Sequence, residues 1–316
     1  MDRSKSYSPI SSIFPFPVAS MWLILALCSS LIWAIVHILD EHCVDRVFTK
    51  PWIGVLTSSG ISAGIFLLVP FLGQKIIIPS WEILFVCLLT GAIIQGSQYY
   101  YFLALDCSDC GTVSAYWNLT PTFLPIISYW LFGYVITGNN YVGIGMLVLG
   151  SIGLCLNDRL PDKWDALYLM TIAASLQTIV VLLEKFIFDR TDFFGAFLSI
   201  TIGTIFAGLS SFRLKEVQTT FRANLPSIGK AWRVLVAIEL LNWAALYLGQ
   251  FAVKDGIPSL VSAIEASIPA FAFGLTMGIA FLNRQFESYK KGLGLKLAMI
   301  GLMMVGVWLI GAGVEG

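Results

Sequence analysis

Charged residues are scarce in this chain of 316 residues. They make up 12% of it, while hydrophobic residues make up 57% and the mean hydropathy is +0.82. A soluble globular protein carries about 25% charged residues, so a water-exposed surface cannot be built from this composition. A bilayer core of about 30 Å needs about 20 apolar residues per helix, and the chain divides into runs of that length. The sequence therefore predicts an all-α polytopic membrane protein.

Blocks of basic residues are also missing, and the formal net charge is zero. Nucleic acid is therefore not an expected partner. Three of the six cysteines, Cys28, Cys87 and Cys155, lie inside apolar runs, which excludes the disulfide framework of small secreted proteins. Cys107 and Cys110 have a pairing-like spacing, but the chain has no second pair and only two histidines. We expect two ordinary loop cysteines, no metal site and no cofactor.

Motifs of intramembrane and ATP-driven enzymes are absent as well. The sequence has no His-Glu-x-x-His, no paired intramembrane aspartates and no Gly-x-x-x-x-Gly-Lys. These absences disfavour an intramembrane enzyme and an ATP-hydrolysing pump. A non-transporting membrane sensor or scaffold stays open as an alternative.

Ten apolar runs have the length of transmembrane helices. The polar segment 1–18 precedes them, and residues 19–157 and 158–316 hold five runs each. The first run is too long for a signal peptide and lacks a small-residue cleavage site, so we expect it to be retained. The polar stretch 213–230 is expected to be a loop along the membrane interface. The expected helices are 19–39, 51–71, 82–104, 112–134, 140–156, 164–187, 193–211, 231–252, 257–282 and 292–312.

The two halves of the chain resemble each other at offsets of 144 to 149 residues. Apolar helices can look alike by chance, but offsets that stay within 144 to 149 in three separate places disfavour chance. Five helices per half make the second half enter the membrane from the opposite side, which is an inverted repeat typical of transporters. The matches are Val113-Ser114-Ala115, Pro121 and Phe123 with Val261-Ser262-Ala263, Pro269 and Phe271; Asp40 and Asp45-Arg46 with Glu184 and Asp189-Arg190; and Gly143 and Gly145 with Gly292 and Gly294.

The segments 104–123 and 252–271, each a small-residue turn, an apolar helix and a central proline, resemble the EamA-type transporters of the drug/metabolite transporter superfamily. The resemblance covers nearly the whole chain and includes the glycine-rich fifth and tenth helices. It implies a transporter with cytosolic termini. The family commonly ends its fourth and ninth helices with a Leu-Gly-Glu type sequence. This chain departs from that pattern, since the corresponding positions end at Tyr134 and Arg284 and both glutamates are missing.

Pro121 and Pro269 lie inside expected helices, where each removes one hydrogen bond and frees the carbonyl four residues earlier. Those carbonyls belong to Trp117 and Glu265. At membrane depth a freed carbonyl is tolerated where protein or a water-filled cavity satisfies it, so both kinks should face the interior. The alternative is that the prolines merely bend helices for packing.

Polar and aromatic side chains inside the expected spans are candidates for a substrate cavity, because sites for organic molecules combine apolar walls with a few polar groups. We expect helices 3, 4, 8 and 9, with helices 1 and 6, to line one central cavity, and helices 5 and 10 to be peripheral. For each aromatic residue taken alone, lipid contact or core packing is the simpler alternative. The candidates are Trp33, Gln95, Gln98, Trp117, Asn118, Gln177, Glu239, Asn242, Trp243, Tyr247, Ser262 and Glu265.

Lysine and arginine are absent from the middles of the expected spans, which disfavours anionic substrates. We therefore expect a secondary transporter of a small neutral, zwitterionic or cationic organic metabolite or drug. A carboxyl group at mid-bilayer persists mainly where it has a cavity or a function. Glu265 is the first candidate for proton coupling and Glu239 the second, and the alternative is that Glu265 is a structural group bonded to a neighbouring helix.

Two arguments about orientation disagree. Lysine and arginine number 6 on the surface that holds the termini and 13 on the opposite surface. The positive-inside rule then puts both termini outside, whereas the family resemblance puts them in the cytosol, so orientation stays open. The expected partners are a small-molecule substrate and the lipid bilayer of the plasma (inner) membrane. A homodimer is an open alternative.

Overall fold

The computed structural model describes residues 18–67, 69–73, 76–108, 113–114, 116–133, 136–155, 163–282 and 293–312. Cys110, Ala115, Tyr134, Arg284 and Gly292 lie outside the described residues. Within the described ranges the chain is helical and has no strand. Seven helices are long and apolar enough to cross a membrane, and Gly294–Ile310 is a shorter apolar helix. The predicted all-α membrane fold is therefore confirmed.

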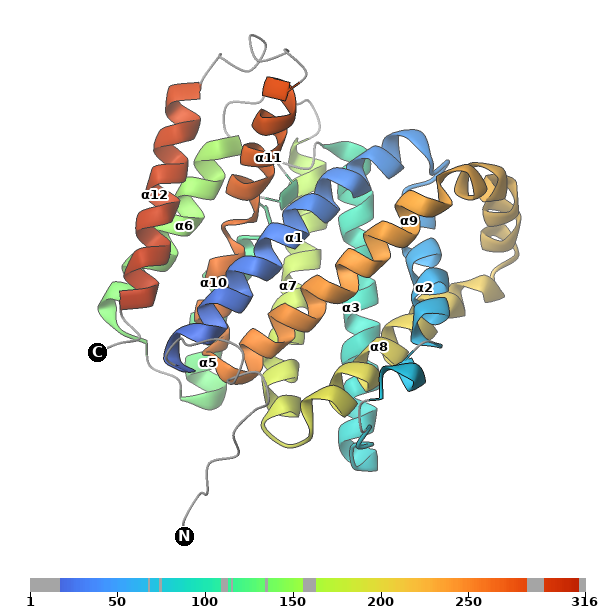
Figure 1. The fold of residues 1–316 in the computed structure, drawn as a ribbon, viewed down its shortest axis with the longest axis horizontal. Coiled ribbons are helices and arrows are strands. Elements are labelled where there is room, and N and C mark those ends of the chain that lie inside the picture. Colours follow the sequence, from blue (N-terminus) through green and yellow to red (C-terminus); the bar gives the residue numbers. More distant parts are fainter. Residues whose placement is uncertain are drawn as a thin grey trace.

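Helix is found within each of the ten ranges predicted from the sequence (Figure 1). The elements are α1 (Val18–Arg46), α2 (Ile53–Phe66), η1 (Val69–Leu72), α3 (Trp81–Cys107), α5 (Leu119–Phe132), α6 (Gly138–Cys155), α7 (Lys163–Phe188), α8 (Phe193–Ser210), η2 (Ser211–Arg213), α9 (Lys215–Asp255), α10 (Pro258–Glu265), α11 (Ile268–Leu282) and α12 (Leu293–Ala312).

Four pairs of helices make the most extensive contacts. α1 lies along α9 across the middle of the molecule, α3 packs against α7 and α8, and α6 pairs with α12 at one edge (Figure 1). The α6–α12 pair is close because Gly143 and Gly306 face each other. A Cβ atom on either glycine would lie 2.8 Å from the carbonyl oxygen of the other. Any larger residue at these positions would push the two helices apart.

The polar stretch predicted to be a loop is helical, which corrects the sequence prediction. α9 begins at Lys215, and its first turns lie at an angle to the remainder of the helix (Figure 1). Its buried residues there include Val217 and Asn224. The Asn224 side chain accepts a hydrogen bond from Thr49 N at 2.9 Å and donates one to Val47 O at 3.2 Å. These contacts with the residues directly after α1 stabilise a helix that has too few apolar residues to be recognised as one.

Both expected proline kinks are breaks in the helix. α10 ends at Glu265 and α11 begins at Ile268, so Pro269 lies in the first turn of a new helix. A proline is accommodated there because the first N–H groups of a helix have no partner within it. Pro121 likewise lies in the first turn of α5, directly after a tight turn in which Thr120 N donates to Trp117 O at 2.9 Å. The prolines therefore begin new segments, a sharper interruption than the predicted bend.

Candidate functional site

Two cavities lie between the helices and share one wall. Cavity A, of about 70 Å³, is lined by α1, α2, α3, α8 and α9, and contains Glu239. Cavity B, of about 90 Å³, is lined by α1, α3, α7, α9 and the two interrupted helices, and contains Glu265. Trp33, Gln98 and Gln250 are among the residues that line both. The shared wall makes the two cavities neighbouring parts of one interior region.

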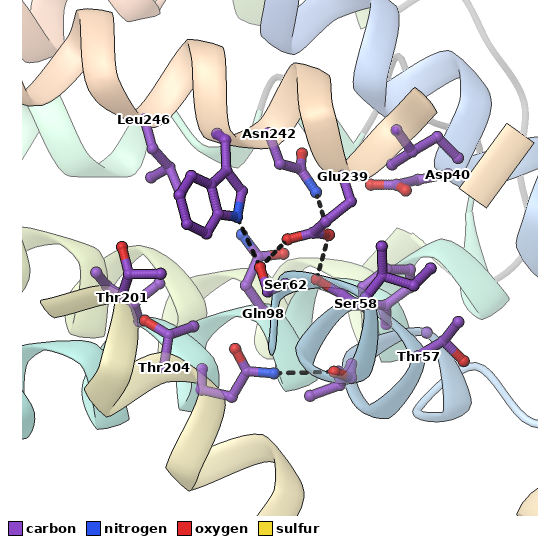
Figure 2. A pocket seen from close by; sticks show the side chains of 18 of the residues that line it. Asp40, Thr57, Ser58, Ser62, Gln98, Thr201, Thr204, Glu239, Asn242 and Leu246 are labelled. Atoms are coloured by element: carbon purple, nitrogen blue, oxygen red, sulfur yellow. Dashed lines mark hydrogen bonds between the residues drawn. The ribbon is translucent and has the colours of Figure 1, made fainter. Parts of the chain in front are cut away.

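Glu239 is held in cavity A by hydroxyl and amide donors (Figure 2). Ser58 Oγ donates to Glu239 Oε2 at 2.7 Å, Asn242 Nδ2 donates to the same oxygen at 3.2 Å, and Ser62 Oγ donates to Oε1. Trp243 Nε1 in turn donates to Ser62 Oγ at 2.8 Å. Both carboxyl oxygens are thus engaged, and the network ties α2 to α9.

A second acidic residue of cavity A was missed by the sequence prediction. Asp40 is 6% exposed, and Tyr101 Oη donates to its Oδ2 at 3.3 Å. It lies near enough to Glu239 for the two carboxylates to repel each other when both are ionised. The prediction ended the first helix at residue 39, but α1 continues to Arg46 along α9, which brings Asp40 inside. The repeat match of Asp40 with Glu184 was the available signal.

Cavity B also holds two carboxyl groups, Glu184 and Glu265. Gln250 Nε2 donates to Glu184 Oε1 at 2.7 Å, and both residues are 4% exposed. The Glu265 carboxyl makes no hydrogen bond to any other described residue. Gly249 faces it without a side chain, since a Cβ atom there would lie 3.6 Å from Glu265 Oε1. Glu265 is therefore the carboxyl of cavity B with neither oxygen bonded to another described residue.

Aromatic rings form another part of cavity B. Trp33, His37 and Trp117 line it. The His37 ring centroid lies 6.0 Å from that of Trp33 and 5.2 Å from that of Tyr101, which in turn lies 5.9 Å from Trp117. His37 Nδ1 lies 2.8 Å from Ser114 Oγ, which fixes the imidazole ring. The cavity thus combines flat apolar walls with a few acidic and amide groups.

The structure brings together most of the predicted cavity residues, and the exception is Tyr247. Tyr247 lines neither cavity and packs on α8, with ring centroids 5.3 Å from Phe193 and 5.5 Å from Phe197. α2 and α8 line cavity A in addition to the predicted helices, and no described residue of α6 or α12 lines either cavity. Cavity A holds Gln95, Glu239, Asn242 and Trp243; cavity B holds Trp117, Asn118, Pro121, Gln177, Ser262 and Glu265; and Trp33 and Gln98 line both.

Gln95 has a structural contact that the sequence did not reveal. Its Nε2 donates to Val55 O at 3.0 Å and to Ser59 Oγ at 2.9 Å, which joins α3 to α2 at the edge of cavity A. In the part of the chain that the structure describes, no group of three or more His, Cys, Asp or Glu side chains is arranged to hold a metal ion.

Comparison with known proteins gives a family match over part of the chain and a similar fold. Residues 20–156 match the EamA-like transporter family. A solved structure entitled "Crystal structure of protein" superposes with a TM-score of 0.65 at 15% identity, covering 92% of this chain and 98% of the other. No curated protein matches the sequence. The similar structure supports the fold alone. The matched residues lie in the first predicted repeat, in agreement with the resemblance to EamA-type transporters predicted from the sequence.

Proposed function

We propose that this protein is a secondary transporter that moves a small neutral, zwitterionic or cationic organic molecule across the plasma (inner) membrane. The observation that carries the proposal is the acidic, partly aromatic interior formed by cavities A and B. It contains Asp40, Glu184, Glu239 and Glu265, and no lysine or arginine occurs among its described lining residues. Such a surface attracts cations and repels phosphate esters and other anions.

The proposed architecture is ten spans in two inverted five-helix repeats. α1 packs along α9, and α7 packs along α3. This exchange of partners is expected if the first half of the chain is related to the second by a pseudo-two-fold axis in the membrane plane. The offset of 144 residues also relates Gln95 to Glu239 and Gln98 to Asn242, and all four line cavity A or both cavities. The substrate region then lies at the interface of the repeats.

Proton coupling through Glu265 is the second part of the proposal. Glu265 ends α10 where the helix is interrupted, and its carboxyl lies in cavity B without a hydrogen bond to the described residues. A carboxyl group at membrane depth that changes its protonation changes the charge of the cavity at little structural cost, because it has no partner to release. The neighbouring break supplies a place where α10 and α11 can move relative to each other.

Flux through proteoliposomes tests the transporter function. The panel consists of alkylamines, amino acids, polyols and sugar phosphates, measured by counterflow with the purified full-length protein. We expect flux for at least one compound of the first three classes and none for sugar phosphates. Binding of panel compounds without flux would identify a sensor or scaffold instead. For a transported compound, a Glu265→Gln variant that still concentrates it in response to a pH gradient would rule out coupling through Glu265.

A further inference from the structure

Cavity B contains buried oxygen atoms that no described residue uses. Gln250 Oε1 and Ser262 Oγ lack a hydrogen-bond partner among the described residues, and these side chains are 4% and 2% exposed. The carboxyl of Glu265 is also without a hydrogen bond to the described part of the chain. All three residues line the same cavity. Folded proteins rarely leave buried polar atoms unsatisfied, so this cluster calls for a ligand.

The orientation of the Gln250 side chain is fixed by its other end. Its Nε2 is committed to Glu184 Oε1 at 2.7 Å, which leaves the amide oxygen as the end available to a ligand. Ser262 lies in α10 one turn before Glu265, so the two side chains occupy the same face of that short helix. The three residues therefore present a carboxylate, an amide oxygen and a hydroxyl oxygen from two elements.

These three acceptor groups favour a cation that has several hydrogen-bond donors. An ammonium group has three N–H donors and no acceptor, which matches three oxygen acceptors of which one is charged. Glu184 adds negative charge, because it lies near enough to Glu265 for the two carboxylates to repel each other. We propose that cavity B binds the primary ammonium group of an organic amine through Glu265, Gln250 Oε1 and Ser262 Oγ. This inference deepens the proposed transport function and rests on it for the passage of the amine.

The remainder of the cavity favours an organic amine over an inorganic cation. Trp33, Trp117, Val181 and Ile268 line it and provide aromatic and aliphatic surface for a hydrocarbon body. Among the described lining residues His37 is the one basic residue, and its imidazole ring is held by Ser114. A hydrated metal ion would gain nothing from these walls.

Probe binding to the wild-type protein gives the first test. The full-length protein in lipid nanodiscs is titrated by calorimetry with hexylammonium, with hexanol and with hexyltrimethylammonium. Hexanol lacks the charge, and hexyltrimethylammonium keeps the charge but has no N–H donor. We expect each analogue to bind at least about tenfold more weakly than hexylammonium, because each loses charge-assisted hydrogen bonds. Equal binding of either analogue would overturn the proposal.

Variants locate the site. We expect Glu265→Gln to weaken hexylammonium binding by about tenfold to a hundredfold and Ser262→Ala by about threefold to tenfold. The matched controls are Glu216→Gln, at an exposed position in the first turn of α9, and Ser199→Ala, whose hydroxyl bonds the backbone of its own helix. The controls should leave affinity unchanged. Unchanged affinity in Glu265→Gln would overturn the proposal, and the analogue titrations remain decisive if a variant fails to fold.

Sodium competition and flux separate this inference from the proposed function. Displacement of hexylammonium by sodium chloride, but not by the same concentration of choline chloride, would identify an inorganic-cation site and overturn the inference. Specific hexylammonium binding without flux of any panel compound leaves the ammonium site in place and refutes transport. Flux of polyols or amino acids without hexylammonium binding supports transport and refutes the ammonium site.

Discussion

Gln250 of α9 donates a 2.7 Å hydrogen bond to Glu184 of α7 at the wall between the two cavities. Both side chains are buried, so the bond forms where few water molecules can replace it. α7 and α9 are not neighbours in sequence. α7 packs mainly against α3 and α9 packs mainly against α1, and the contact between α7 and α9 is much smaller. The pair therefore joins two helices that otherwise hold separate parts of the bundle.

Loss of this hydrogen bond should destabilise the fold. We expect Gln250→Leu to lower the free energy of unfolding by about 1–3 kcal/mol, because the buried Glu184 carboxyl is left without its donor. Thermal unfolding in detergent measures the change. The matched control is Gln177→Leu, since Gln177 also lines cavity B but makes no hydrogen bond to another described residue, and its effect should stay within about 0.5 kcal/mol. A Gln250→Leu, Glu184→Leu double variant should recover stability, and a double variant as unstable as the sum of the two single ones would contradict this account.

Trp243 and Glu239 should be energetically coupled through Ser62, which bonds both. In a double-mutant cycle, Trp243→Phe and Glu239→Gln should show an interaction energy of about 0.5–3 kcal/mol, as is usual within one hydrogen-bond network. The comparison cycle pairs Trp243→Phe with Glu184→Gln, which share no hydrogen-bond partner and should be additive within about 0.5 kcal/mol. Equal interaction energies in the two cycles would show that Ser62 does not transmit the coupling.

The sequence predicted the helical class and most of the residues that line the two cavities, because both depend on local composition. Glu239 and Glu265 are carboxyl groups surrounded by apolar residues, and this pattern is visible without a structure. Asp40 was missed because the apolar run ends before it, whereas the helix continues through tertiary contact with α9. A helix that begins at Lys215 could not be predicted either, because its stability depends on contacts of Asn224 with the residues directly after α1.

Tyr247 shows where the spacing argument fails. Glu239, Trp243 and Tyr247 follow one another at four-residue steps and were assigned to one face. Four residues exceed one turn of 3.6 residues, so two such steps rotate the side chain by about 80°. Trp243 still reaches Ser62 in cavity A, but Tyr247 has turned toward Phe193 and Phe197 of α8.

Glycine is required where α3 crosses α8. A Cβ atom at Gly91 would overlap Ile200 O, and one at Gly203 would overlap Leu88 O. The obstructing atoms belong to helix backbones, which cannot move aside as a side chain can. We expect Gly91→Ala and Gly203→Ala each to lower the free energy of unfolding by about 1–3 kcal/mol.

The control substitution is expected to raise the free energy of unfolding instead of lowering it. A Cβ atom at Gly64 of α2 meets no atom within 4 Å. Gly64→Ala should therefore raise stability by up to about 1 kcal/mol, because alanine favours the helix more than glycine does. Thermal unfolding of the three variants under one condition makes the comparison, and similar losses in all three would show that helix contact is not the cause.

Acidification should weaken hexylammonium binding. Protons and the ammonium group compete for the same oxygen atoms of Glu265, and a protonated carboxyl no longer attracts a cation. The other titratable groups that face the site, Glu184 from α7 and His37 from α1, act in the same direction, because each becomes less negative or more positive as the pH falls. Affinity should therefore rise with pH, with a slope of at most about tenfold per pH unit for each proton released on binding.

Three variants identify the group that releases the proton. Calorimetric titrations with hexylammonium across a range of pH should show that affinity depends less steeply on pH in Glu265→Gln than in the wild-type protein, because the competing carboxyl is gone. Glu184→Gln and His37→Asn should keep most of the wild-type slope, since Glu265 is intact in both. A slope that persists in Glu265→Gln and disappears in Glu184→Gln would assign the proton to Glu184, whose hydrogen bond to Gln250 would then have to open in each cycle. That outcome would assign proton coupling to the contact between α7 and α9 instead of to α10.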